Sequence, residues 1–272
     1  MTTYKHLATA TLLLLCSLTL SAQTDSIVSD KTITNARMIA VGATNILDTY
    51  LSPEKYRGTE LRYISHTVRE RDGRRWSRQI VHQGDISYAD NRSGEGGEIA
   101  GMYNFQYFWH LNWALCNRRL HLKAGGGADA NVGFIYNTRN GNNPAQARLY
   151  LNADVSVAAA YTFPLLGRNA VATYEASVPL LGVMFSPNYG QSYYEIFSQG
   201  NYDHNVVPTT LLCTPSVRQM LTLDAELLGI TWRIGYLCDI QQSHVNNLKS
   251  HIYTHAFMIG VVKRFKLINY KL

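Results

Sequence analysis

Four side chains of the kinds used in acyl transfer fall within residues 187–215. They are Ser192, Glu195, Asp203 and His204. A serine nucleophile needs a base held beside it and an acid that orients the base. The sequence has no G-x-S-x-G motif, and nothing in its spacing fixes a serine next to a base. We therefore expect no enzyme activity, and an enzyme that modifies outer-membrane lipid is the alternative.

His251 and His255 have the spacing that would bring two metal ligands together on a helix. Their stretch alternates as a strand, on which residues four apart are separated by about 13 Å, too far to share an ion. Outside the first 22 residues, Cys116, Cys213 and Cys238 have no metal-like spacing, although one pair could form a disulfide in an oxidising compartment. We expect neither a metal nor another cofactor.

The same stretch, 187–215, is rich in aromatic side chains that suit contact with a partner. The candidate binding residues are Tyr189, Tyr193, Tyr194, Tyr202 and His204. Exposed aromatic rings are common anchors in binding surfaces. We expect a folded surface loop that contacts a glycan or a protein, or that has no partner and is purely structural.

The elements that hold these residues are strands. In EIAGMYNFQYFWHLNWAL, residues 98–115, every second residue is apolar or aromatic, and the polar residues Asn104, Gln106, His110 and Asn112 all fall on the other face. At the period of a helix the same polar residues would scatter around the circumference. The stretch therefore predicts a long strand with one apolar face and one polar face.

Alternation of this kind recurs along the chain. It predicts ten strands, near 33–45, 58–71, 74–89, 98–114, 118–136, 147–163, 168–186, 216–226, 229–241 and 249–266. Short connections alternate with long ones, and the long ones are 46–57, 90–97, 137–146, 187–215 and 242–248.

Tight turns at one end and longer loops at the other are typical of an up-and-down transmembrane β-barrel with an even number of strands. We expect an all-β antiparallel barrel of about ten strands, within a range of eight to twelve. A soluble periplasmic β-barrel or sandwich that binds a ligand is the alternative, and its apolar faces would point inward. Outward aromatics such as Trp109, Trp113 and Trp232 would form girdles against outer-membrane lipid.

The polar faces would line the lumen. The candidate lumen-lining residues are Lys123, Asp129, Arg148, Asp154, Glu175 and Arg233. Both signs of charge are present and a barrel of this size is narrow, so these side chains can pair and fill the interior. A plugged barrel is favoured over a thin ion path, and we do not expect a wide pore.

The first 22 residues resemble a secretory signal peptide, with Lys5 and His6 before an apolar run and small residues before Gln23. A retained anchor or a lipoprotein signal at Cys16 is the alternative. We expect residues 1–22 to be removed and residues 23–272 to form a single β-barrel domain. The net charge of +6 is spread out, so we expect no nucleic-acid partner.

Three stretches resemble a family of exported proteins of Bacteroidota that is catalogued as a domain of unknown function. They are FSPNYGQSYYEIFSQGNYDHN, SVRQMLTLDAELLGITWRIGYLCDIQQSHVNNLKSH and HAFMIGVVKRF. Members of that family look like outer-membrane barrels, and the resemblance implies a fold and a location but no activity.

We expect a non-enzymatic outer-membrane protein with periplasmic termini and with a structural role, a surface-loop binding role or a narrow channel. The final strand ends in aromatic Phe265, as strands read by the barrel assembly machinery do, so that machinery is a further expected partner.

Overall fold

The computed structural model describes residues 31–165 and 167–267. The predicted signal peptide and the two chain termini lie outside these residues. Among the described residues, no helix is long and apolar enough to cross a membrane.

Ten long strands make up the body of the structure. They are β1 (Lys31–Asp48), β2 (Ser52–Arg71), β3 (Trp76–Asp90), β4 (Gly97–Leu115), β5 (Leu120–Asn137), β6 (Ala145–Leu165), β7 (Arg168–Phe185), β9 (Val217–Leu227), β10 (Ile230–Val245) and β11 (Leu248–Leu267). Each of the ten overlaps one predicted strand, because alternation between an apolar and a polar face is a strong signal over so many residues. The short strand β8 (Val206–Thr210) and the helix α2 (Tyr193–Phe197) were not predicted.

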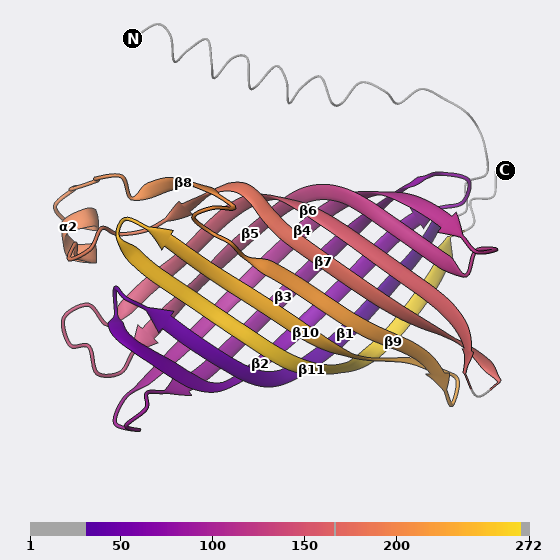
Figure 1. The fold of residues 1–272 in the computed structure, drawn as a ribbon, viewed down its shortest axis with the longest axis horizontal. Helices are drawn as coiled ribbons and strands as arrows, with labels where there is room; N and C mark the ends of the chain where they lie inside the picture. Colours follow the sequence, from indigo (N-terminus) through magenta and orange to yellow (C-terminus); the bar gives the residue numbers. More distant parts are fainter. Residues whose placement is uncertain (1–30, 166, 268–272) are drawn as a thin grey trace, which may run out of the picture. The chain divides into compact units, whose positions relative to one another are not determined.

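The ten strands close into an antiparallel barrel (Figure 1). Each pairs with the strand before it and the strand after it, and β1 pairs with β11 along its whole length, from Lys31 opposite Leu267 to Asp48 opposite Ser250. The short β8 adds to the end of β7 instead of taking a place in the ring. The predicted up-and-down barrel of about ten strands is confirmed.

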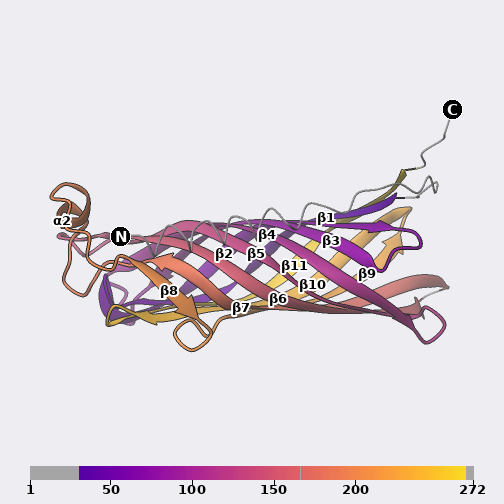
Figure 2. The same cartoon turned by 90° about the horizontal axis from the view of Figure 1, so that it is seen from above.

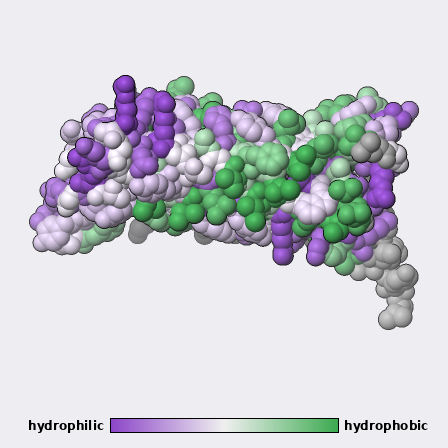
Figure 3. Space-filling model, turned by 90° about the horizontal axis from the view of Figure 1, so that it is seen from below, coloured by the Kyte–Doolittle hydropathy of each residue, from purple (hydrophilic) through white to green (hydrophobic). Residues whose placement is uncertain are grey.

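The outside of the barrel is apolar and the inside is polar. On β4, the outward Trp109 is 48% exposed, whereas the inward Asn104 is 2% exposed and His110 is fully buried. In Figure 3 the visible face is apolar along the middle of the barrel, and hydrophilic residues gather toward the ends. A soluble barrel has the opposite arrangement, so the soluble alternative does not fit. A closed ladder with an apolar belt satisfies every requirement of a wall surrounded by lipid.

The two ends of the barrel differ in their connections. At one end, called the turn end, the strands are joined at 72–75, 116–119, 166–167 and 228–229, and the described residues Lys31 and Leu267 also lie there. At the other, called the loop end, the connections are 49–51, 91–96, 138–144, 186–216 and 246–247. Helix α2 lies beyond the strands at the loop end in both Figure 1 and Figure 2.

Two of the predicted long loops are wrong. The strands on either side continue through 46–57 and 242–248, and only tight turns remain, at 49–51 and 246–247. The second is a two-residue hairpin in which Asn246 and Asn247 both have positive φ, of 49° and 61°. Asparagine accepts this conformation more readily than most residues, which is why a hairpin of this type fits here.

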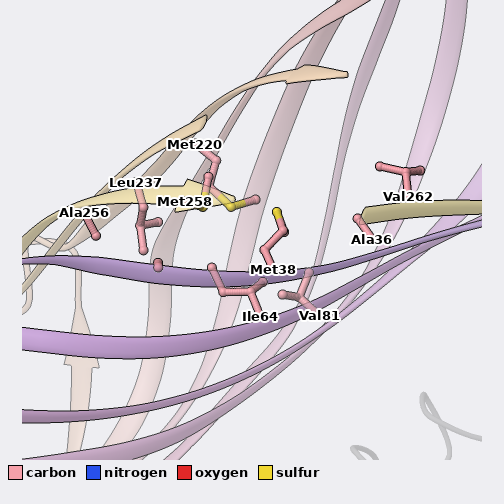
Figure 4. Close-up of a cluster of buried hydrophobic side chains, with 10 residues drawn as sticks. Ala36, Met38, Ile64, Val81, Met220, Leu237, Ala256, Met258 and Val262 are labelled. Atoms are coloured by element: carbon pink, nitrogen blue, oxygen red, sulfur yellow. The ribbon is translucent and has the colours of Figure 1, made fainter. Parts of the chain in front are cut away.

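Inside the barrel, two apolar clusters lie on either side of a polar layer. Along the inner face of β1, Ala36, Met38 and Ala40 belong to one cluster (Figure 4), Thr44 to the polar layer, and Ile46 to the second cluster near the loop end. Apolar side chains from several strands therefore pack inside the lumen on both sides of the polar layer.

We predict that a cation on the lipid-facing wall is tolerated only near the ends of the strands. Phe105→Arg, near the middle of β4, should cost about 2–4 kcal/mol of unfolding free energy in vesicles, and Leu115→Arg, at the turn end of the same strand, about 0–1 kcal/mol. Urea unfolding of the folded barrel in phospholipid vesicles measures both. Equal losses at the two positions would contradict the membrane placement.

Candidate functional site

The polar layer of the lumen centres on Arg62 of β2. Its Nη1 lies 2.6 Å from Oδ2 of Asp239, on β10, and its Nε lies 2.7 Å from Oε1 of Glu60. Asp85 completes the set at 3.6 Å. Glu60 and Arg62 both point inward because they are two residues apart on one strand, and Arg62 is only 2% exposed. One buried cation thus holds carboxylates from three strands.

A second arginine extends this network across the lumen. Arg218, on β9, donates from Nη2 to Asp239 over 3.1 Å and from Nη1 to Oδ1 of Asn104, on β4, over 2.8 Å. Strands β5, β6 and β7 lie between β4 and β9 on the shorter way around the barrel. The amide of Asn104 in turn donates to Asp129 and to Asn131. The network therefore joins opposite walls.

Nearer the turn end, His66 and Glu175 form a separate bridge. Nε2 of His66 on β2 lies 3.0 Å from Oε2 of Glu175 on β7, and Gln79 donates to the same oxygen over 3.1 Å. Strands β3 to β6 lie between β2 and β7 in one direction, and β1, β11, β10 and β9 in the other. The bridge spans the full width of the barrel.

Two further pairs use the remaining predicted lumen residues. Arg233 forms a two-pronged ion pair with Asp224 on the neighbouring strand, at 2.6 and 2.7 Å. Lys123 lies 2.6 Å from Glu70 at the turn end. The structure thus places Lys123, Asp129, Glu175 and Arg233 in contact with polar partners inside the barrel.

Arg148 and Asp154, the other two predicted lumen residues, line a small cavity, where Nη2 of Arg148 donates to Oε1 of Gln241 over 3.3 Å. The cavity has a volume of about 50 Å³ and is also lined by Asp129 and Arg218. Nε and Nη1 of Arg148, Nε of Arg218 and Oδ1 of Asp154 are buried and have no hydrogen-bond partner among the described residues. At about 10–15 Å³ for each water molecule, the space suits a few waters and no larger solute.

This cavity lies behind an irregular part of the wall. Strand β9 pairs with β7 only as far as Ser177, and β8 takes over from Leu181 onward. Between them Pro179, which has no N–H to donate, lies beside a break in the register with β6. The connection 211–216 covers the gap, because Leu211 donates to the carbonyl of Leu180 and His244 to the carbonyl of Cys213.

The loop that precedes this connection folds into a cap built around α2. The hydroxyl of Ser192 accepts from the backbone of Glu195, and the Glu195 carboxylate accepts from the Ser192 backbone over 2.6 Å, which is a capping box. The backbone and hydroxyl hydrogen bonds from Ser192 hold the pKa of Glu195 below its ordinary value. A helix of five residues depends on such a cap.

Tyr193 fastens the cap to the barrel. Its hydroxyl accepts from the backbone of Ala147 over 2.7 Å and donates to Gln146 over 2.8 Å. Its ring lies 6.0 Å from that of Phe185 and 5.8 Å from that of Tyr50. Burial raises the pKa of Tyr193 and raises that of Tyr50 to about 12.

The predicted binding residues therefore divide into two groups. Tyr193 packs against the barrel, whereas Tyr189, Tyr194 and Tyr202 are 73%, 66% and 72% exposed. His204 is also exposed, and its Nδ1 lies 2.5 Å from Oδ1 of Asp203. The cap presents three rings to solvent on a hydrogen-bonded framework.

The residues considered for catalysis and metal binding do not converge. The hydroxyl of Ser192 donates to Glu195, not to a histidine. His251 hydrogen-bonds to Asn45 and His255 to Tyr236. Within residues 31–165 and 167–267, no group of three or more candidate ligands could hold a metal ion.

Sequence reasoning missed the centre of the polar layer. Glu60, Arg62 and His66 alternate on one face of the predicted strand 58–71, so the same pattern that selected Glu175 would have selected them. One feature of the sequence pointed to the irregular wall beside the cavity: Pro179 lies inside a predicted strand, and a proline there indicates an edge or a bulge.

We predict that removing one partner from the polar layer is costly. Arg62→Met should lower the unfolding free energy by about 3–5 kcal/mol, because the buried charge of Glu60 would lose its cation and Asp239 would keep only Arg218. Arg168→Met, which breaks the exposed pair with Glu226, should cost about 0.2–1 kcal/mol. Urea unfolding in vesicles gives both values, and similar values would show that the lumen is hydrated and open.

We predict a structural role for Ser192. Ser192→Ala should cost about 1 kcal/mol of local stability, which makes hydrogen exchange of the amides in 193–199 about fivefold faster. Tyr194→Ala removes an exposed ring and leaves the capping box intact, so exchange should stay unchanged. Loss of lipid turnover in Ser192→Ala with unchanged exchange would contradict this role and favour the enzyme alternative.

Three of the solved structures that match this chain share less than 10% of its sequence. The translocator domain of the autotransporter NalP from Neisseria meningitidis is 9% identical with a TM-score of 0.39, and the match covers 96% of each chain. The transport unit of the autotransporter AIDA-I from Escherichia coli is 7% identical with a TM-score of 0.39, over 93% of this chain and 96% of that one. Ail from Yersinia pestis is 9% identical with a TM-score of 0.27, and the match covers 86% of this chain and 99% of that one.

No curated protein matches the sequence. The origin in Bacteroidota stays a prediction. The model of one family, described as "Protein of unknown function (DUF3316)", matches residues 8–272. Because this match spans nearly the whole sequence, the predicted membership is confirmed, and the chain belongs to the DUF3316 family.

Proposed function

We propose that the protein is a closed, non-conducting barrel of the outer membrane that holds a folded aromatic cap at the cell surface. It acts by contact, as a structural or binding protein, and neither passes solutes nor catalyses a reaction. The outer membrane is the proposed location because closed barrels with an even number of strands and an apolar belt are typical of it. The predicted signal peptide agrees with export.

The observation that carries the proposal is that hydrogen bonds and ion pairs cross the lumen from wall to wall. Arg62 reaches Asp239, Arg218 reaches Asn104, and His66 reaches Glu175. Apolar clusters lie on both sides of the Arg62 network. An ion that crossed this interior would have to break buried charge pairs. A closed barrel is therefore favoured over a narrow channel.

With the lumen closed, the cap is the surface that remains for recognition. Three exposed tyrosines on a rigid framework supply large contact area at a small cost in conformational entropy. Tyrosine rings can stack on sugar rings or pack against a protein surface, so a glycan and a protein are the two partner classes that we propose. Support against catalysis comes from Ser192, whose hydroxyl is used in the capping box.

For orientation, we propose that the loop end faces outward and the turn end faces the periplasm. The longest connection, 186–216, and the cap lie at the loop end, as the longer loops of such barrels do. Strand β11 ends at the turn end, with Phe265 outward near its end and Phe257 and Ile259 outward near its middle. We propose that the barrel assembly machinery recognises this strand.

We predict that the barrel does not conduct ions. Purified protein inserted into a planar lipid bilayer in concentrated salt should give no conductance steps above those of the bare bilayer, because charged side chains bridge the lumen.

A porin inserted under the same conditions is the positive control for the recording. Insertion of the barrel itself is checked by its faster gel mobility without boiling. Reproducible steps from the wild-type barrel would contradict the closed lumen and favour the narrow channel.

A further inference from the structure

An open basic pocket lies on the outer wall at the turn end of β2, β3 and β4. It has a volume of about 350 Å³. Its five cations are Lys31, Arg69, Arg71, Arg74 and Arg78. All four arginines are exposed. Arg69, Arg71 and Arg78 lie on the wall that faces lipid, and Arg74 lies in the adjoining turn.

Cations of this pocket lie directly opposite one another on neighbouring strands. Arg69 of β2 is directly opposite Arg78 of β3, and Lys31 of β1 is directly opposite Arg71 of β2. Like charges directly opposite on neighbouring strands destabilise a sheet. Two such pairs side by side form a site where a bound anion would offset the repulsion.

The nearby carboxylates are engaged elsewhere. Glu70 also borders the pocket, but its Oε1 lies 2.6 Å from Nζ of Lys123. Asp72 in the adjoining turn lies 3.8 Å from Nζ of Lys266. Within the described part of the chain, none of the four arginines in the pocket has an ion pair with a carboxylate.

Two tryptophans indicate how deep the pocket lies in the membrane. Trp76 and Trp109 line it and are 57% and 48% exposed, and Trp109 is directly opposite Arg78. Tryptophan is enriched where hydrocarbon meets headgroups, and the next outward residues toward the barrel's middle are Ile80 and Tyr107. The cations therefore lie at the level of lipid phosphates.

We propose that this pocket binds the phosphate headgroup of an anionic phospholipid in the leaflet around the turn end. Guanidinium groups fit phosphate oxygens in a fork of parallel hydrogen bonds, and the tryptophan rings lie against the upper part of the acyl chains. The inference rests on the membrane location proposed above. It adds a ligand class and a set of residues that the barrel itself does not require.

Tryptophan fluorescence can report on this pocket alone. The sequence has four tryptophans, and the parent protein for the test carries Trp113→Phe and Trp232→Phe, so that only Trp76 and Trp109 remain. The full chain is folded into phosphatidylcholine vesicles that contain either brominated phosphatidylglycerol or brominated phosphatidylcholine. Bromine quenches only rings that its lipid touches, so the two titrations give the relative affinity of the pocket for the two headgroups.

We expect about a tenfold preference for phosphatidylglycerol in the parent, which should fall to about one in Arg69→Gln/Arg78→Gln. The matched control is Arg118→Gln/Arg119→Gln, which removes the same charge from exposed residues of another turn at the same end and should keep the preference. An equal preference in all three proteins would overturn the assignment to this pocket.

Inorganic phosphate separates a lipid site from a site for the free ion. At matched ionic strength, phosphate and chloride should weaken the preference equally, by screening alone. Loss of the preference with phosphate but not with chloride would overturn the lipid assignment in favour of the free ion. Gel mobility without boiling is measured on the same samples: an inserted barrel with no preference overturns only this inference, and a chain that does not insert overturns the proposed function and this inference together.

Discussion

The structure depends on one constraint, that every backbone N–H and C=O group in a lipid-facing wall must be paired within the protein. The pairing of β1 with β11 closes the ring and meets this demand for ten strands at once. The constraint is hardest to meet where β9 stops pairing with β7 at Ser177. There the chain uses a proline with no N–H, the short strand β8 and the covering segment 211–216. The proline, β8 and segment 211–216 together thus replace the hydrogen bonds that β9 no longer makes with β7.

A wall with its apolar side outward leaves its polar side chains inside, and a narrow lumen gives them little water. Charged groups then pair inside the barrel, as Arg62 does with Asp239 and His66 does with Glu175. Buried pairs of this kind are costly to break but are weak evidence of net stabilisation, because both charges lose their hydration. The network follows from the placement of the polar side chains inside the barrel, and it supports the proposal that the lumen has no free path.

The sequence predicted the strands because alternation over eighteen or nineteen residues is hard to produce by chance, as in β1 and β4. It also predicted the direction in which Asp129, Arg148 and Glu175 point, since the strand period fixes the face. It could not predict which of these residues meet, because the Arg218–Asn104 contact depends on the tilt and stagger of strands that are far apart in the chain. The turns at 49–51 and 246–247 were missed because polar residues near strand ends resemble loops. Helix α2 is too short to show a period, and in the sequence Tyr193 looks like Tyr189, Tyr194 and Tyr202, although it alone of the four packs against the barrel.

The central claim is that this chain forms a closed barrel in the outer membrane with its polar face inside. The most direct measurement is fractionation of cell envelopes followed by gel electrophoresis of unboiled and boiled samples. The account predicts that the protein is found in the outer-membrane fraction and runs faster without boiling, because the closed ladder stays folded in detergent. A protein that is found wholly in the soluble periplasm, with the same mobility in both samples, would contradict the account.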